Sequence, residues 1–323
     1  MPRILISGAS GLVGSALVPF LESRRCEVTI LVRRRPQGPQ EIQWDPMRQI
    51  APSRASGFDA AIHLSGENVA GRWTSAKKQR IRESRVVSAR NLSQALASAK
   101  TKPAALLCAS AIGYYGNRGD EILDEDNTAG TGFLAEVARE WETATRAASD
   151  AGIRSVNLRI GIVLSRQGGA LKQMLLPFRL GLGGRIGNGR QWWSWIHIDD
   201  LVAAVGHILS VCMERGAPVL SEAEGSPPVQ ITGPVNLVSP NPVTNAEFTR
   251  ALARVLQRPA VLPVPAFAVR LAFGGFADEG LLSSVRVGPK KLLASGFQFR
   301  FPDLDSALAS LLNDGMTMQR GFY

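Results

Sequence analysis

The sequence predicts an α/β protein in which a doubly wound parallel sheet carries helices on both faces, with a smaller, mainly helical region at its C-terminal end. Three observations predict it: a strand, a glycine turn and a helix start open the chain, strand-like apolar runs then alternate with helical stretches, and no internal repeat occurs. The 323 residues are 45% hydrophobic and 20% charged, an ordinary globular composition. We expect a main domain over residues 1–262 and a small helical domain over 263–323.

The first element is a strand over residues 3–7 that runs into a glycine-rich turn and then a helix. Gly8 can adopt the positive φ of a tight turn, Gly11 lets backbone N–H groups approach a pyrophosphate, and Gly14 lets the helix pack close to the strand. The helix N-terminus then faces the anion. This strand, turn and helix predict a dinucleotide site with contacts from Gly8, Ser10, Gly11, Leu12, Val13 and Gly14.

The second strand, over residues 27–32, leads into Arg33, Arg34 and Arg35. In a Rossmann-type fold, an NAD-binding protein usually has an acidic residue here for the ribose hydroxyls. Guanidinium groups instead bind a 2′-phosphate through charge-assisted hydrogen bonds. Arg33 and Arg34 therefore favour NADP(H) as the cofactor, although a merely basic loop is the alternative.

Further buried strands are predicted over residues 58–64, 104–110, 155–160 and 235–238, with helices over 76–99 and 132–151. The carboxyl ends of parallel strands border the ligand crevice of such a sheet. We therefore expect backbone of Leu64, Ser65 and Gly66 to line the cofactor. His63, inside a strand, is expected to be a core residue, and residues 216–234 a long surface loop.

A glycine-rich and aromatic stretch, with loops over 165–198, is predicted to form the substrate side. Trp193, Trp195 and His197 are the candidates for lining a substrate crevice, since tryptophans stack on flat or sugar-like ligands. Simple packing between domains explains these aromatic residues equally well. Asp199 and Asp200, which follow them, are expected to cap a helix N-terminus.

Composition excludes several classes of protein. Cys26, Cys108 and Cys212 form no CxxC pair, and the three histidines have no metal-ligand spacing, so we expect neither disulfides nor a metal site. No run of about 18 apolar residues predicts a membrane helix, and the early first strand leaves no room for a signal peptide, so a cytoplasmic protein is expected. The net charge is +10, but the basic run over residues 72–90 fits a solvated helix face better than a nucleic-acid site.

The chain resembles the extended short-chain dehydrogenase/reductase superfamily, and more closely its divergent NAD(P)-dependent epimerase-like branch with a small C-terminal domain. The motifs that carry the resemblance are GASGLVG at 8–14, HLSGEN at 63–68, SAIGYYG at 110–116, LRIGIVLSRQGGAL at 158–171, LPFRLGLGGRIGNGRQWWSWIHIDDL at 176–201 and NAEF at 245–248. The resemblance implies NADP(H) contacts from Arg33, Arg34, Leu64, Ser65, Arg85 and Ile162.

The sequence departs from this superfamily where the proton-transferring YxxxK motif belongs, because Phe133 and Val137 stand there. The candidate replacements are Tyr115, or its neighbour Tyr114, for proton transfer and Ser110 for a hydrogen bond to a carbonyl oxygen. Two hypotheses follow: an oxidoreductase or epimerase acting on an unknown small carbonyl or sugar-like substrate, or an NADP-binding regulatory or sensor protein that has lost catalysis. A homodimer is possible, but the sequence does not give the oligomeric state.

Overall fold

A computed structural model describes residues 1–213 and 231–313. Its centre is a seven-stranded parallel sheet with the order β11-β7-β5-β4-β1-β2-β3, which confirms the predicted fold class. The strands are β1 (Arg3–Ser7), β2 (Glu27–Val32), β3 (Glu41–Gln43), β4 (Ala60–His63), β5 (Ala105–Ala111), β7 (Arg154–Ile160) and β11 (Gly233–Leu237). The chain reverses direction across the sheet between β1 and β4, so the glycine turn lies at the topological switch point.

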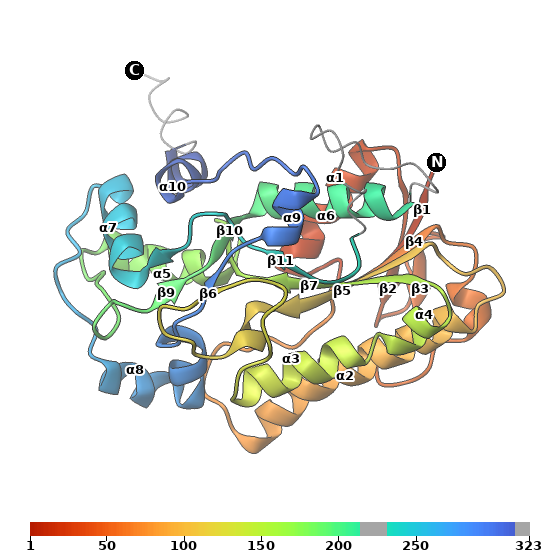
Figure 1. The fold of residues 1–323 in the computed structure, drawn as a ribbon, viewed down its shortest axis with the longest axis horizontal. Helices are drawn as coiled ribbons and strands as arrows, with labels where there is room; N and C mark the ends of the chain where they lie inside the picture. The colour runs from red at the N-terminus through yellow and green to blue at the C-terminus, as the bar shows by residue number, and fades with distance from the viewer. Residues whose placement is uncertain (214–230, 314–323) are drawn as a thin grey trace.

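Helices cover both faces of this sheet (Figure 1). On one face lie α1 (Leu12–Ser23), α6 (Ile198–Met213) and α9 (Lys290–Ala294), and on the other α2 (Ser75–Ala97), α3 (Phe133–Thr143) and α4 (Arg146–Asp150). Successive β1 side chains point to opposite faces. Ile4 and Ile6 therefore join the core under α1 and α6, whereas Leu5 joins the core under α2.

The predicted helix over 132–151 is two helices rather than one. Hydroxyls explain the break: Thr143 donates to the carbonyl of Arg139, and Thr145 to that of Glu142. Ser93 of α2 also donates to the carbonyl of Thr145. After the turn α4 continues along α2 in the same direction as α3 (Figure 1): Arg82 of α2 lies beside Glu136 of α3, and Ser93, further along α2, lies beside Ala148 of α4. The other predicted strands and helices lie within a few residues of their observed ends, and residues 216–230 of the predicted loop lie outside the described part of the chain.

The remaining elements lie beyond the carboxyl ends of the sheet strands. They are β6 (Ile122–Leu123), β8 (Ile162–Leu164), α5 (Gly169–Arg179), β9 (Trp192–Trp193), β10 (Trp195–His197), β12 (Val243–Thr244), α7 (Asn245–Leu256), α8 (Ala266–Phe273), a π turn (Ala277–Leu281), β13 (Arg286–Val287) and α10 (Leu304–Asn313). The C-terminal region shares its cores with the main domain: Leu308 packs with Phe248 of α7, and Leu292 with the α6 side of the sheet.

The glycine turn brings three backbone segments into contact. Gly8 has φ +79°, and a Cβ there would lie 2.7 Å from the carbonyl carbon of Leu64. A Cβ on Gly14 would lie 2.3 Å from the carbonyl oxygen of Gly8. Both positions therefore exclude a side chain, as the sequence predicted.

Replacing Gly14 by alanine should destabilise the protein by about 1–3 kcal/mol, because the new methyl group overlaps a backbone oxygen that cannot move aside. Alanine is the better helix former by about 1 kcal/mol, so a gain in stability would show that the turn relaxes freely. Gly38→Ala is the control, since a Cβ there meets nothing within 4 Å. Urea unfolding of the three proteins measures the difference.

His63 is fully buried in β4, as predicted, and connects the sheet to α2. Its Nδ1 lies 2.6 Å from the hydroxyl of Ser7, and its Nε2 3.0 Å from that of Ser88. Burial lowers its pKa from 6.5 to about 4. The folded state therefore holds the imidazole neutral, while the unfolded chain takes up a proton as soon as the pH falls below 6.5.

The contribution of His63 to the free energy of unfolding should therefore be fully present above pH 6.5 and be lost as the pH drops from 6.5 to 4. Over that range the wild type should lose about 3 kcal/mol more than a His63→Gln variant, which has no imidazole to titrate. Unfolding free energies measured at several pH values test this. Parallel pH profiles for the two proteins would contradict the assignment.

Candidate functional site

A pocket of about 380 Å³, here called the strand-end pocket, opens beyond the carboxyl ends of β5 and β7. Its wall is mainly apolar and comes from five parts of the chain. They are the end of β5 and the following turn (109–113), α3, the β7–β8 connection (160–162), β9 with Ser194, and the C-terminal residues Phe276, Glu279, Gly280, Ser283 and Val285. Val69 and Arg85 complete it. Small-molecule sites have this composition, with few polar groups in an apolar wall.

A chain of contacts links the pocket to the glycine turn through the β4–α2 connection. Gly8 lies against the backbone of Leu64 and Ser65, and Gly66 lies against the guanidinium of Arg85, which lines the pocket. The other side of the turn touches the segment after β8, where Leu12 packs on Gly168 and Gly169. Ile162, at the start of β8, is itself a lining residue. Most of the predicted cofactor residues therefore lie along one path, which leads from the glycine turn past Leu64, Ser65 and Gly66 to Arg85 and the pocket.

Arg85 presents hydrogen-bond donors to this path. Its Nη1 donates to the carbonyl of Ile81 at 3.2 Å, and its guanidinium lies 5.2 Å from the centre of the Trp141 ring. Burial lowers its pKa to about 10, opposed by the charge of Glu67. The group is thus still a cation near neutral pH, and in the described part of the chain it forms no ion pair within 4.0 Å.

Ser110 is the predicted catalytic residue that reaches the pocket. It lies at the end of β5, 3% exposed, and its hydroxyl donates to Glu142 Oε1 at 2.7 Å. Arg159 lies beside Ser110 in the β5–β7 register and holds the same carboxylate with both ends of its guanidinium, Nε to Oε1 at 2.8 Å and Nη2 to Oε2 at 2.8 Å. Burial opposes the charge of Arg159, but the hydrogen bonds and charge of Glu142 outweigh it and raise the pKa of Arg159.

The structure separates Tyr115 from the pocket. Its side chain is fully buried, and its hydroxyl lies between Arg159 Nη1, Asn236 Oδ1 and the carbonyl of Asp124, at 2.8 to 2.9 Å. Burial raises its pKa to about 12. Among the described residues Tyr115 is thus bound to the far side of Arg159 and does not line the pocket with Ser110.

The pocket face of α3 carries no proton-transferring side chain. Leu134, Val137, Ala138 and Trp141, at helical spacing, are the residues of α3 that line the pocket. Phe133 is turned to Trp73 instead, with 5.2 Å between ring centres, and Lys78 lies over its ring. Ser110, Glu279 and Arg85 are polar side chains of the pocket wall that lie near this helix.

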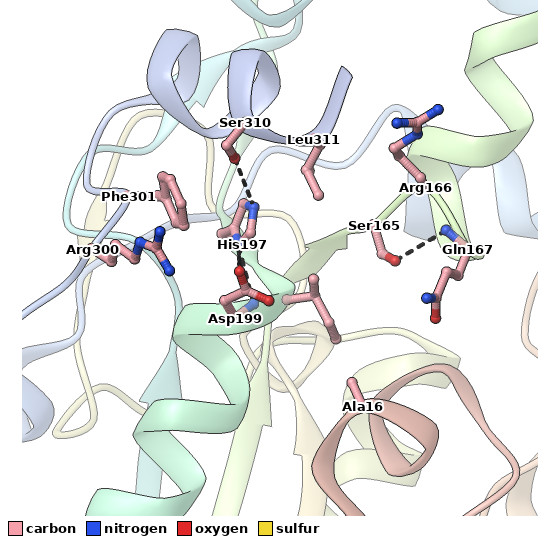
Figure 2. Close-up of a pocket in the computed structure, with 11 residues that line it drawn as sticks. Ala16, Ser165, Arg166, Gln167, His197, Asp199, Arg300, Phe301, Ser310 and Leu311 are labelled. Atoms are coloured by element: carbon pink, nitrogen blue, oxygen red, sulfur yellow. Dashed lines mark hydrogen bonds and ion pairs between the residues drawn. The ribbon is translucent and has the colours of Figure 1, made fainter. Parts of the chain in front are cut away.

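The three residues predicted to line the substrate side lie in three different places. Trp193 lines the strand-end pocket, but Trp195 is fully buried in the core with α5, α7 and α10, and its Nε1 donates to the carbonyl of Asn241 at 3.1 Å. His197 lines a second pocket of about 340 Å³ between α6, α10 and Ala16 of α1, where its Nε2 lies 3.1 Å from the Ser310 hydroxyl (Figure 2). Trp193 belongs to β9, which pairs with β12, whereas Trp195 and His197 lie at the two ends of β10, beside Ile162 and Leu164 of β8.

The arginines after β2 differ in their partners. Arg34 is held by Glu41 of β3, with its two terminal nitrogens 2.7 and 2.6 Å from the two carboxylate oxygens. Within the described residues Arg33 is exposed and forms no ion pair within 4.0 Å. Arg33 therefore has its whole guanidinium available at the end of β2, whereas Arg34 offers only its remaining donors.

Glu142 and Arg159 were not predicted as site residues. A signal did exist, since Arg159 interrupts an apolar strand predicted to be buried, and a buried arginine requires a partner. The partner cannot be read from the sequence, because Glu142 lies on a helix 17 residues earlier and is brought to Arg159 only by the packing of α3. Glu279 belongs to the C-terminal region. The sequence shows no pattern from which the contact of this region with the pocket could be predicted.

Fold, glycine turn and pocket together define a dinucleotide-binding α/β protein. Residues 4–218 match the model of the NAD dependent epimerase/dehydratase family, and residues 264–311 that of a domain of unknown function (DUF1731). The chain belongs to the NAD dependent epimerase/dehydratase family. This confirms the resemblance inferred from the motifs.

Relatives match almost the whole chain. Epimerase family protein Mb2239 of Mycobacterium bovis is 45% identical over 307 residues, which cover 94% of this chain and 96% of that protein. Human epimerase family protein SDR39U1 is 37% identical over 314 residues, 96% of this chain and 99% of that protein. The crystal structure of human SDR39U1 (isoform 2) with NADPH superposes with a TM-score of 0.84 at 34% identity, covering 97% of this chain and 99% of that one.

Two exclusions apply to residues 1–213 and 231–313. No group of three or more histidine, cysteine, aspartate or glutamate side chains there could hold a metal ion. None of the helices in these two ranges combines the length and apolar character needed to cross a membrane.

Replacing Trp195 by alanine should lower the free energy of unfolding by about 3–5 kcal/mol, because it leaves a large cavity in the core. Trp192→Ala is the matched control: Trp192 is partly exposed, bonded to Asp120 and stacked on Arg286, so its loss should cost clearly less. Thermal and urea unfolding measure both. Equal stability of the two variants would show that Trp195 is not a core residue.

Proposed function

We propose that this protein is an NADP(H)-dependent oxidoreductase or epimerase-like enzyme acting on a small carbonyl or sugar-like substrate. The observation that carries the proposal is the single path from the glycine turn, past Leu64 to Gly66 and Arg85, into the strand-end pocket beside Ser110. The similar human protein crystallised with NADPH supports the choice of cofactor.

The residues present fit the pyrophosphate of such a cofactor. The first turn of α1 has no side-chain cap and no acidic residue, so its N–H groups stay available for an anion. Gly8 and Gly14 keep side chains out of the approach. We assign the turn to the pyrophosphate, Leu64 to Gly66 and Ile162 to the walls, and Arg85 and Ser110 to the polar contacts in the pocket. When bound, the cofactor supplies the hydride chemistry, and the protein orients the reactants.

Arg33 should set the preference for NADP(H). A hydrogen bond to a charged group contributes roughly 1.5–3 kcal/mol, so Arg33→Ala should weaken NADPH binding about tenfold to a hundredfold and leave NADH almost unchanged. Arg34→Ala should cost less, because Glu41 already occupies that guanidinium. Titrations by nicotinamide fluorescence at fixed ionic strength measure both.

The control is Arg90→Ala, which removes the same charge from an exposed position on α2 and should change neither affinity by much. Two results would refute the assignment of the 2′-phosphate to Arg33. One is a wild type that binds NADH as tightly as NADPH, and the other is an Arg33→Ala variant with an unchanged ratio.

The enzymatic part of the proposal is tested by turnover. The protein is incubated with NADPH and a panel of ketones, aldehydes and nucleotide sugars, and with NADP⁺ and the matching alcohols. Cofactor oxidation or reduction that Ser110→Ala abolishes supports an enzyme. Tight NADPH binding without turnover of any compound would instead support the regulatory or sensor hypothesis.

A further inference from the structure

We propose that the strand-end pocket takes a hydroxyl group of its ligand, rather than a carbonyl oxygen, at Ser110, because Glu142 holds the only proton that Ser110 can donate. Glu142 is then a positioning residue that sets the hydrogen-bond polarity of Ser110. The proposal rests on the proposed function and narrows its substrate to the alcohol form.

The first step concerns Glu142. Arg159 donates to both of its oxygens at 2.8 Å, in the two-pronged geometry that a carboxylate anion accepts. The pair is nearly enclosed, with 3% of the Arg159 side chain and 12% of the Glu142 side chain exposed. Arg159 is fixed from its other side as well, since its guanidinium lies 3.5 Å from the centre of the Tyr114 ring. A protonated Glu142 would leave a buried cation without its counter-charge.

The second step concerns Ser110. An ionised carboxylate accepts hydrogen bonds and cannot donate one. At 2.7 Å the Ser110 hydroxyl must therefore be the donor to Glu142 Oε1. A serine hydroxyl has one proton and two lone pairs, so Ser110 offers only lone pairs to the pocket. A ligand hydroxyl can donate to these lone pairs. A carbonyl oxygen cannot, because it only accepts hydrogen bonds and would face the Ser110 oxygen with no proton between them.

Two other polar side chains on the substrate side agree, whereas the indole N–H of Trp193, which also lines the pocket, has no hydrogen-bond partner among the described residues. The Glu279 carboxylate accepts from the backbone N–H of Leu134 at 2.7 Å, and like Ser110 it lines the pocket. The hydroxyl of Ser194 donates to the carbonyl of Val285 and accepts from Val287 N–H, so it has no proton left to donate to a ligand. Ser283 adds a hydroxyl that can serve either role. Arg85 lies on the Gly66 side, which we assign to the cofactor.

The ligand probes are cyclohexanol and cyclohexanone, which match in size and apolar character and differ in the polarity of the oxygen. Each is titrated in the combination that cannot react, the alcohol with NADPH and the ketone with NADP⁺, and also by calorimetry without nucleotide. Wild type should bind the alcohol more tightly. Ser110→Ala should weaken the alcohol about tenfold and leave the ketone unchanged or improved.

Glu142→Gln distinguishes polarity from mere structure. With its amide nitrogen in the place of Oε1, glutamine can donate to Ser110 and free the Ser110 proton for the ligand, while its oxygen still accepts from Arg159 Nη2 and the bond from Arg159 Nε is lost. The alcohol should therefore weaken and the ketone strengthen, whereas a purely structural role would weaken both. Tyr115→Phe is the control, because it removes the other polar partner of Arg159 and should leave the alcohol-to-ketone ratio unchanged.

A wild type that binds the ketone at least as tightly as the alcohol, or binds neither, overturns the proposal, and so does a Ser110→Ala variant that loses both equally. Because the probes are also titrated without nucleotide, this outcome is separate from a failure of the proposed function. That failure would appear as an absence of NADPH binding.

Discussion

The close approach of the first helix to the first strand is the constraint on which the nucleotide site depends. With 2.3 Å between the Gly8 oxygen and a Cβ built on Gly14, α1 can start directly above the end of β1 only because Gly14 has no side chain. The same turn fits against the backbone of Leu64, so it also sets where the chain leaves β4. These contacts fix the uncapped first turn of α1 relative to the ends of β1 and β4.

The second organising interaction is the Arg159–Glu142 pair, which joins β7 to α3 under the pocket. Buried ion pairs often contribute little net stability, since desolvation offsets the attraction. Here the pair determines which way the Ser110 hydroxyl points. The pocket face of α3 has neither tyrosine nor lysine. Through Glu142, however, α3 still orients one polar group of the pocket, the hydroxyl of Ser110 on β5.

The sequence predicted what depends on local pattern. Strands with continuous apolar runs, the glycine turn and the buried His63 are all recognisable from residue type and spacing. It could not show that the chain passes from β9 to β10 within this stretch and pairs with a different strand in each, so Trp195 and His197 were grouped with Trp193 although their side chains lie in a core and in another pocket. Nor could it pair Arg159 with Glu142, or Arg34 with Glu41, because both contacts depend on how separate elements pack.

We propose that the glycine turn, Arg33 and the strand-end pocket bind the dinucleotide together. The most direct measurement is a crystal structure of the protein with NADP⁺. We expect the pyrophosphate at the first N–H groups of α1, the 2′-phosphate beside Arg33 and the nicotinamide in the strand-end pocket near Ser110. A nicotinamide bound outside that pocket, or a 2′-phosphate away from Arg33, would contradict it.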